Sequence, residues 1–130
     1  RAREAAYFAG WTLYDAGQLR AASDRMRAFV SRWPRDARAT EAFWYAGWAS
    51  FLDGRFEDAI ATWSEMNAAH PRSDLVPFAH YWTGRALQEL KRTDEALRSY
   101  ESTVRASPSA FTRSWRGSAS LRSGQRSTCP

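Results

Sequence analysis

The carboxylates are the first residues that could do chemistry, because two adjacent acids can divide the roles of general acid and general base. Two such pairs occur, Glu57-Asp58 and Asp94-Glu95. Both fall at the expected starts of helices, where acidic side chains are stabilised by the helix dipole. We therefore interpret both pairs as solvated residues of a first helical turn, and we predict no catalytic residue among them.

Metal ligands and nucleophiles are equally sparse. His70 and His80 are the only histidines, and Cys129 is the only cysteine. Neither histidine has a second histidine or a cysteine at the spacing of a metal site, and one cysteine excludes an internal disulfide and a thiolate metal site. The chain also contains no glycine-rich phosphate loop and no nucleophile elbow. The sequence predicts no metal site and no cofactor.

Aromatic residues recur at helical spacing and are the candidates for a binding surface. Three sets stand at i, i+4 and i+7, which places each set on one face of a helix. The nine positions are Tyr7, Trp11, Tyr14, Trp44, Trp48, Phe51, Tyr81, Arg85 and Gln88. They predict either a groove for a peptide or a glycan strand, or residues that pack against the adjacent part of the fold. Packing is the favoured alternative, because aromatic residues this dense are unfavourable when exposed.

The elements that position these residues belong to a repeat with a period of 37 residues. A glycine, an alanine and a proline recur at that spacing. They are Gly10, Ala22 and Pro34, then Gly47, Ala59 and Pro71, then Gly84, Ala96 and Pro108. A glycine within a helix costs about 1 kcal/mol relative to alanine. We therefore expect Gly47 to permit a close approach of two helices, with Ala59 as its small partner.

Each copy predicts a helix, a tight turn, a second helix and a proline that ends it. The expected helices span about 2–16, 19–32, 37–53, 55–69, 78–91 and 93–106, with 37–53 the longest. Ser73 or Asp74 can cap the fifth helix, and Pro77 fits its opening turn. The prediction is an all-α domain over 1–111, with repeats at about 4–36, 41–73 and 78–110. Residues 112–130 form a basic Ser/Arg-rich tail that we expect to be disordered, either as a natural linker or as an out-of-frame end.

The spacing of these anchors resembles the tetratricopeptide repeat, which has small residues at its eighth and twentieth positions and a proline at its thirty-second. The large residue expected sixteen positions after the glycine is Met26, Trp63 or Tyr100. The resemblance implies three tandem helix-turn-helix repeats in a right-handed superhelix. It also implies that the nine candidate groove positions given above lie on the concave face. The period departs from the usual ~34 residues, so three extra residues lengthen each linker or the following first helix. The third copy is weaker, with Lys91 and Thr93 where the others have glycine and a large apolar residue.

The third copy is also similar to the helical scaffold that precedes the catalytic domain of soluble lytic murein transglycosylases. The residues that carry this resemblance are Tyr81, Trp82, Gly84, Arg85, Ala86, Leu87, Glu95, Ala96 and Tyr100. It implies a scaffold that helps to guide a peptidoglycan glycan strand, a missing C-terminal catalytic domain, and a place in the periplasm or cell envelope. The same motif occurs in envelope proteins such as the outer-membrane assembly lipoproteins. Glu101-Ser102 repeats the catalytic dipeptide of that family, but residues 103–106 do not continue its motif, so we predict that Glu101 is not catalytic.

The distribution of charge excludes one class of partner. The net charge is +5, yet all fourteen acidic residues lie within 1–101 together with fourteen of the 19 basic residues. A nucleic-acid binder carries its basic footprint on the folded face, so we predict no nucleic-acid partner. No apolar run approaches the ~20 residues that span a membrane, so we predict no membrane span.

Two functions remain on the sequence alone. The first is a non-catalytic interaction scaffold, part of a bacterial transglycosylase that acts on peptidoglycan. The alternative is a free-standing tetratricopeptide adaptor that binds a protein or peptide partner in the cell envelope.

Overall fold

The computed structural model describes residues 1–106, and all regular secondary structure in that part of the chain is helical. Six helices of 14 residues each follow one another. Their bounds are α1 Ala2–Asp15, α2 Leu19–Arg32, α3 Ala39–Leu52, α4 Phe56–Ala69, α5 Val76–Glu89 and α6 Thr93–Ala106. The prediction of an all-α fold with three helix-turn-helix units is confirmed.

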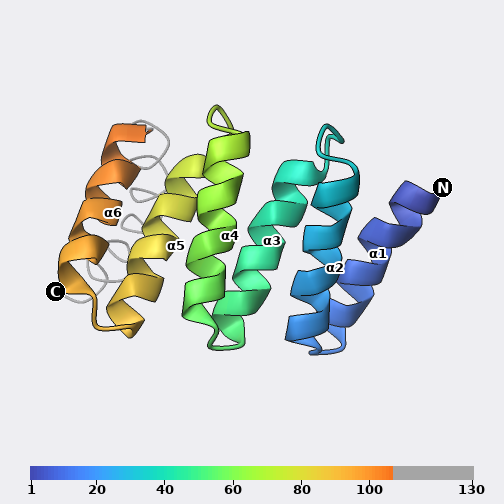
Figure 1. The fold of residues 1–130 in the computed structure, drawn as a ribbon, viewed down its shortest axis with the longest axis horizontal. Helices are drawn as coiled ribbons and strands as arrows, with labels where there is room; N and C mark the ends of the chain where they lie inside the picture. Colours follow the sequence, from blue (N-terminus) through green and yellow to red (C-terminus); the bar gives the residue numbers. More distant parts are fainter. Residues whose placement is uncertain (107–130) are drawn as a thin grey trace, which may run out of the picture.

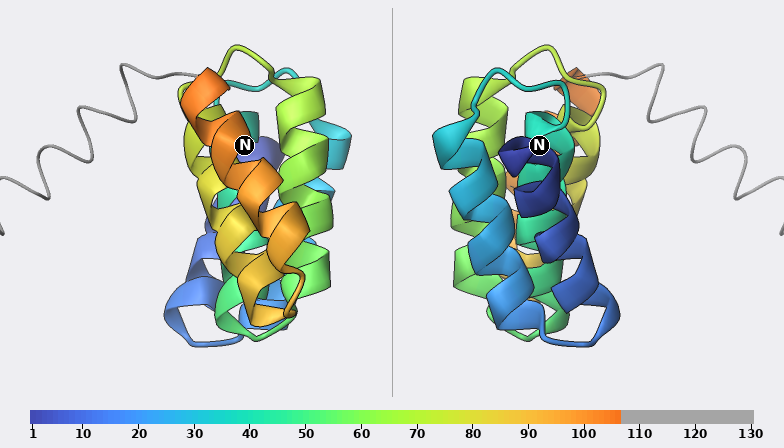
Figure 2. Two further views of the ribbon diagram at one scale, coloured as in Figure 1. Left: turned by 90° about the vertical axis from the view of Figure 1, so that its left-hand side faces the viewer. Right: turned by 90° about the vertical axis from the view of Figure 1, so that its right-hand side faces the viewer.

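The helices stack in chain order along one axis, each packed on the helix before it, in a superhelical arrangement (Figure 1). Figure 2 shows the stack from its two ends, with α6 nearest the viewer in one view and α1 in the other. The core runs the length of the stack rather than gathering at one centre. Its fully buried large side chains include Phe29, Met26, Trp63 and Met66. Each unit therefore buries its apolar surface chiefly against its immediate neighbours, as repeat architectures do.

The three extra residues of the period lie in the linkers. The expected helix 37–53 is wrong at its start, because α3 begins at Ala39 and is no longer than the others. Linker 33–38 forms two consecutive turns, closed by hydrogen bonds from Asp36 N to Trp33 O and from Ala39 N to Asp36 O, at 3.1 and 2.9 Å. Linker 70–75 repeats both bonds, each at 3.1 Å. The same pair of turns recurs in both linkers, so these turns rather than a longer helix set the spacing between units.

Polar side chains stabilise these linkers from within. Asp36 accepts a hydrogen bond from the backbone N–H of Arg38 at 2.9 Å, and this bond holds the pKa of the Asp36 carboxyl below its usual value. Ser73 Oγ accepts the equivalent bond from Leu75 N at 3.1 Å. The predicted capping of α5 by Ser73 or Asp74 is therefore wrong, because the N-cap residue is Leu75 and α5 has no side-chain capping hydrogen bond. Pro77 lies in the first turn, as expected.

The helical glycines make room for a large side chain of the partner helix. A Cβ placed on Gly47 would stand 2.6 Å from Cδ1 of the Trp63 ring, and one on Gly84 would stand 2.6 Å from Cε1 of Tyr100. The three atoms nearest to the missing Cβ of Gly47 all belong to Trp63. The expected pairing of Gly47 with Ala59 is therefore wrong. The glycine admits the large residue sixteen positions later, not the small one twelve positions later.

The tight turns within each pair need a residue in the left-handed region. Gly17 and Gly54 both have φ of 79°, and Lys91 holds the same place in the third pair with φ of 64°. The hydrogen bonds agree: Gly17 N, Gly54 N and Lys91 N each donate to a carbonyl three residues earlier at 3.0 Å. A left-handed backbone costs a non-glycine residue about 1–2 kcal/mol. The tertiary fold imposes this conformation on Lys91.

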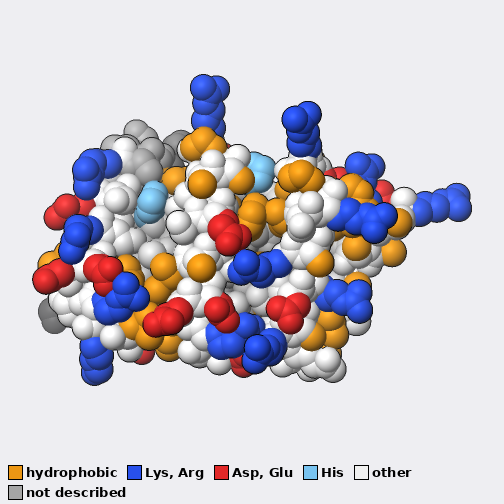
Figure 3. Space-filling model, viewed as in Figure 1, with side chains coloured by type: hydrophobic (Ala, Val, Ile, Leu, Met, Phe, Trp, Pro, Cys, Tyr) orange, Lys and Arg blue, Asp and Glu red, His pale blue; other side chains and the backbone are white. Residues whose placement is uncertain are grey.

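Surface charge follows the sequence analysis in the part that the structure describes. Basic and acidic side chains are interspersed on the face shown in Figure 3, with no broad field of one sign. No helix within residues 1–106 is long and apolar enough to cross a membrane. The predictions for the tail 112–130, for the end of the third repeat at 110, for the domain end at 111, and for Pro108 and Cys129 lie outside the described residues.

We expect Gly47→Ala to lower the free energy of unfolding by about 1–3 kcal/mol, the usual cost of overpacking a core, although alanine is the better helix former. Urea denaturation measures this loss. Gly10→Ala is the matched control, because its Cβ would meet the flexible end of Met26, with Sδ at 3.0 Å, and Met26 can move aside. Equal stabilities for Gly47→Ala and the wild type would contradict the packing described.

We expect Lys91→Gly to raise the free energy of unfolding by about 0.5–1 kcal/mol, because glycine adopts positive φ without the steric penalty. Thermal denaturation of the full chain checks this. Lys91→Ala serves as the control, since it removes the lysine side chain but keeps the Cβ, and it should leave stability near that of the wild type. A stabilisation by both changes alike would point to the charge rather than the backbone.

Candidate interaction site

The nine predicted groove positions lie on the first helix of each pair, namely α1, α3 and α5. Tyr7 is buried, and Arg85 and Gln88 are exposed. The other six are half-buried. The structure thus places all nine on corresponding helices, but it packs most of them into the stack. Whether they bind a ligand stays a prediction.

The central pair shows how the aromatic side chains pack. Trp48 stacks on Trp44 at 6.2 Å between ring centroids and on Phe51 at 5.6 Å. Trp44 stacks in turn on the fully buried Trp63 at 5.2 Å. Trp48 also donates its indole N–H to the hydroxyl of Tyr14, at 3.1 Å, in the preceding unit. These rings join neighbouring helices and leave only part of their surface for a ligand.

A second set of aromatic residues, which the sequence analysis did not select as a site, packs one helix pair against the next. We call Phe8, Tyr45 and Trp82 the second column, and the nine predicted groove positions the first column. Tyr45 lies 4.4 Å from Trp11, and Trp82 lies 5.0 Å from Trp48 and 5.5 Å from Phe51. Tyr45 and Trp82 are 37 residues apart, and Phe8 precedes them at the same interval. The repeat frame could have shown this column, because each member directly follows a residue of the first column.

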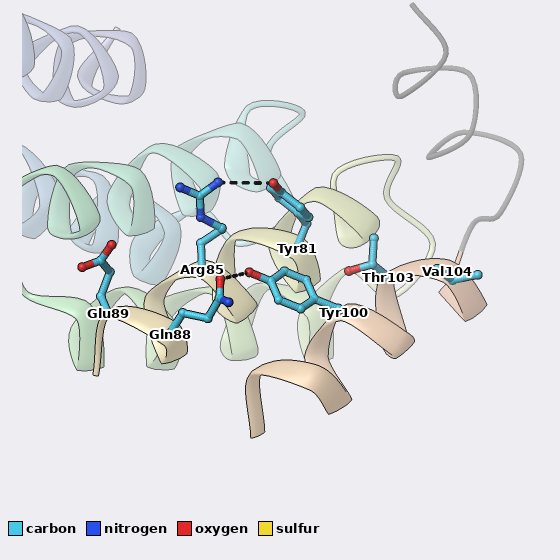
Figure 4. A pocket seen from close by; sticks show the side chains of 7 residues that line it. All are labelled: Tyr81, Arg85, Gln88, Glu89, Tyr100, Thr103 and Val104. Carbon is cyan, nitrogen blue, oxygen red and sulfur yellow. Dashed lines mark hydrogen bonds between the residues drawn. The ribbon is translucent and has the colours of Figure 1, made fainter. Parts of the chain in front are cut away.

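A pocket of about 570 Å³ opens between α5 and α6 (Figure 4). Three predicted residues line it together with four that were not selected. The lining residues are Tyr81, Arg85, Gln88, Glu89, Tyr100, Thr103 and Val104. Arg85 donates a hydrogen bond to the Tyr81 hydroxyl at 3.3 Å, and the Tyr100 hydroxyl donates to Gln88 Oε1 at 2.5 Å. The pocket therefore combines two phenol rings with a guanidinium, an amide and a carboxylate.

The electrostatics of this pocket suit binding rather than proton transfer. The hydrogen bond to Tyr81 raises the pKa of Arg85, which stays a cation. Burial raises the pKa of Tyr100, so its phenol stays protonated. Burial lowers the pKa of the nearby His80, which favours the neutral imidazole. The pocket can accept an apolar or aromatic group with polar contacts at its rim.

Two further hollows lie elsewhere on the described stack. One, of about 460 Å³, is lined by Arg27, Ala28, Val30, Ser31, Phe43 and Glu65. The other, of about 650 Å³, is lined by residues of linker 33–38, among them Pro34, and by His70 at the start of the next linker. None of the nine predicted positions lines either hollow. Of these three hollows among the described residues, the pocket between α5 and α6 is the one lined by predicted groove positions.

The acidic pairs make local ion pairs. Asp58 pairs with Arg55 at 3.0 Å, and Glu95 pairs with Arg92. The hydrogen bond from Arg92 lowers the pKa of Glu95, which favours its ionised form. Glu101 is exposed on α6 and lies 3.7 Å from Arg105. No group of three potential metal ligands occurs within residues 1–106. These acids therefore have the surroundings of surface residues rather than of a catalytic pair.

Comparisons with known proteins agree with the architecture. A tetratricopeptide repeat profile matches residues 7–74, and a second profile of the same repeat matches residues 78–110. Among solved structures, 22 chains match. One is the crystal structure of MamA, with a TM-score of 0.64 and 22% identity over 90% of this chain and 68% of that one. No curated protein sequence matches the chain. At this identity the likeness to MamA concerns the fold alone.

We expect Trp48→Ala to lower the free energy of unfolding by about 2–4 kcal/mol, somewhat below the range for a fully buried tryptophan. It removes two stacked contacts, one edge contact and a hydrogen bond. Tyr14→Phe is the control, since it removes only the hydroxyl and should cost about 1 kcal/mol. Unchanged stability of Trp48→Ala, with ligand binding lost, would show that Trp48 serves a ligand instead.

Proposed function

The chain belongs to the tetratricopeptide repeat family, and on that premise we propose that it is a non-catalytic interaction module that binds a protein partner. The pocket between α5 and α6 carries this proposal. Trp82 of the third pair packs on Trp48 and Phe51 of the second, whereas Arg85 and Gln88, at the corresponding positions of the third pair, line a hollow. The site offers recognition chemistry, and the acids of the described chain offer none of the surroundings that catalysis needs.

The side chains of the pocket select for a particular kind of partner. The rings of Tyr81 and Tyr100 lie 5.5 Å apart and provide apolar contact surface. Arg85 lies over the ring of Trp82 at 5.5 Å, so the aromatic ring holds its guanidinium in place. Arg85 and Glu89 at the rim can pair with either charge. A peptide or protein segment that presents an aromatic or large apolar side chain, with polar groups beside it, fits these requirements.

A murein glycan strand is the second candidate ligand. Tyr81, Arg85 and Tyr100, which carry the resemblance to the transglycosylase scaffold, all line the pocket. Aromatic rings beside hydrogen-bonding groups also suit the faces of a sugar. This candidate implies a parent protein that works in the periplasm or cell envelope and continues into a catalytic domain. The sequence of the parent gene beyond residue 130 tests that part directly.

The test uses two probes with the full chain. A phage library of random peptides is panned on the immobilised protein, and the affinities of the selected peptides are measured by calorimetry. Purified murein glycan strands are tested in parallel by pull-down. We expect selected peptides with an aromatic or large apolar anchor, and we expect Arg85→Ala combined with Gln88→Ala to weaken their binding about tenfold or more, or by about 1.4 kcal/mol.

Arg98→Ala is the matched control, since Arg98 is an exposed arginine of α6 that does not line the pocket. Both variants should melt like the wild type, because Arg85, Gln88 and Arg98 are all exposed. Binding unaffected by the double change would place the ligand elsewhere. Retention of glycan strands without any selected peptide would favour the second candidate over the first.

A further inference from the structure

The two hollows of the first and second pairs adjoin, because Val30 and Phe43 line both of them. Together they form a groove at the junction of these pairs, which we call the α2–α4 groove. α2 and α4 lie on one side of the stack, and linkers 33–38 and 70–75 lie at one edge of it (Figures 1 and 2). All lining residues of the groove fall within 27–70, and none of them lines the pocket between α5 and α6. The groove is therefore a separate surface.

Apolar side chains line the larger hollow of the groove on several sides. Val30 and Phe43 are buried, at 6 and 8% exposure. Pro34, Ala37 and Ala69 line the same hollow and are exposed. Its volume of about 650 Å³ falls within the range of ~300–1,000 Å³ that is usual for ligand sites. A hollow of this size and lining suits a large apolar side chain.

The charged side chains that line the groove are paired, with one exception. Asp36 pairs with Arg38 at 3.2 Å, and Arg27 pairs with Glu65 at 3.5 Å. The guanidinium of Arg35 is exposed and has no ion pair within residues 1–106. The charge that stays unpaired in the groove is therefore positive, and a carboxylate of a partner complements it.

The second linker provides a comparison within the chain, because its residues hold the same places 37 positions later. Arg72 holds the place of Arg35, and His80, a polar residue, holds the place of Phe43. Arg72 lines neither hollow of the groove. The combination of an unpaired cation with an apolar hollow thus distinguishes linker 33–38 from linker 70–75.

We propose that the α2–α4 groove is a second docking surface, which binds a peptide segment with a large apolar side chain beside one or two acidic residues. The apolar side chain enters the larger hollow against Phe43, and a carboxylate pairs with Arg35. The ring of His70 stands edge-on to Phe43 at 6.0 Å, lines the same hollow and offers a ring nitrogen for a hydrogen bond. One unpaired cation suits such a peptide better than a nucleic acid, whose binding depends on many phosphate contacts. This inference goes beyond the proposed function, because it concerns another surface.

The probe for the first experiment is an array of short blocked peptides, each with one large apolar residue beside two, one or no acidic residues. A matched set carries asparagine and glutamine in place of the acids. The labelled full chain is applied to the array, and fluorescence anisotropy gives the dissociation constants. We expect the acidic peptides to bind about two- to five-fold more tightly than their amide counterparts, the effect of an exposed ion pair. Equal binding of the two sets overturns the proposal.

Two variants test the two parts of the groove. Arg35→Glu reverses the charge and should abolish the preference for acidic peptides. Ala37→Trp fills the larger hollow and should weaken every bound peptide about tenfold or more, or by about 1.4 kcal/mol. Arg72→Glu and Asp74→Trp are the matched controls, because they introduce the same residues at the same places of the second linker and line neither hollow.

The controls should bind the peptides within about twofold of the wild type, since exposed charges beyond the site contribute little. All four positions are exposed, so each variant should melt like the wild type. A preference for acids that survives Arg35→Glu, or controls that lose binding as the test variants do, would show that the groove is not the site.

Amide chemical shifts of the isotopically labelled full chain then locate the bound peptide. We expect shifts at Phe43 and His70 and none at Arg85 or Gln88, which line the pocket between α5 and α6. A peptide that shifts Arg85 and leaves Phe43 unchanged supports the proposed function of that pocket and overturns this inference alone. Single-stranded DNA is titrated in parallel, and tight binding that depends on Arg35 would replace the peptide by a nucleic acid as the partner.

Discussion

The packing of one large side chain over one helical glycine holds each helix pair together. In the second pair the Trp63 ring occupies the space that a side chain at Gly47 would fill, and Trp63 is fully buried there. In the third pair Tyr100 lies over Gly84 in the same way. Tyr100 is also a wall of the pocket. The contact between Tyr100 and Gly84 that fixes the spacing of α5 and α6 therefore also forms a wall of the candidate site. A change in this contact would alter the shape of the pocket.

The pocket exists because the third pair carries different side chains from the second at the same positions. Where the second pair has Trp48 and Phe51, which Trp82 covers, the third has Arg85 and Gln88. Polar, flexible side chains tolerate exposure better than a tryptophan and a phenylalanine would. The difference keeps the frame of the repeat while replacing two aromatic packing residues by exposed polar ones.

Several charged residues pair with nearby residues of opposite charge. Salt bridges such as Arg55–Asp58 and Arg92–Glu95 join neighbours at helix starts, and Arg3–Asp36 ties α1 to the first linker. The hydrogen bond from the Arg38 backbone lowers the pKa of Asp36, and the hydrogen bond from Arg92 lowers the pKa of Glu95, so both favour the ionised carboxylate. An acid that must give up a proton near neutral pH needs the opposite surroundings, burial or a neighbouring like charge. Asp36 and Glu95 lie beside arginines instead.

The sequence by itself determined the repeat, the number of helices within residues 1–106 and most of their bounds, with α2 and α4 ending where the pattern predicts. These features are local: helical periodicity, a turn residue and a proline act within a few positions of themselves. It did not determine the partner of Gly47, since spacing shows which residues share a face but not which side chain fills a gap. The left-handed backbone of Lys91 and the turns of linker 33–38 likewise follow from the packing around them. The pocket is the clearest case, because Arg85 and Tyr100 line it together only when α5 and α6 pack.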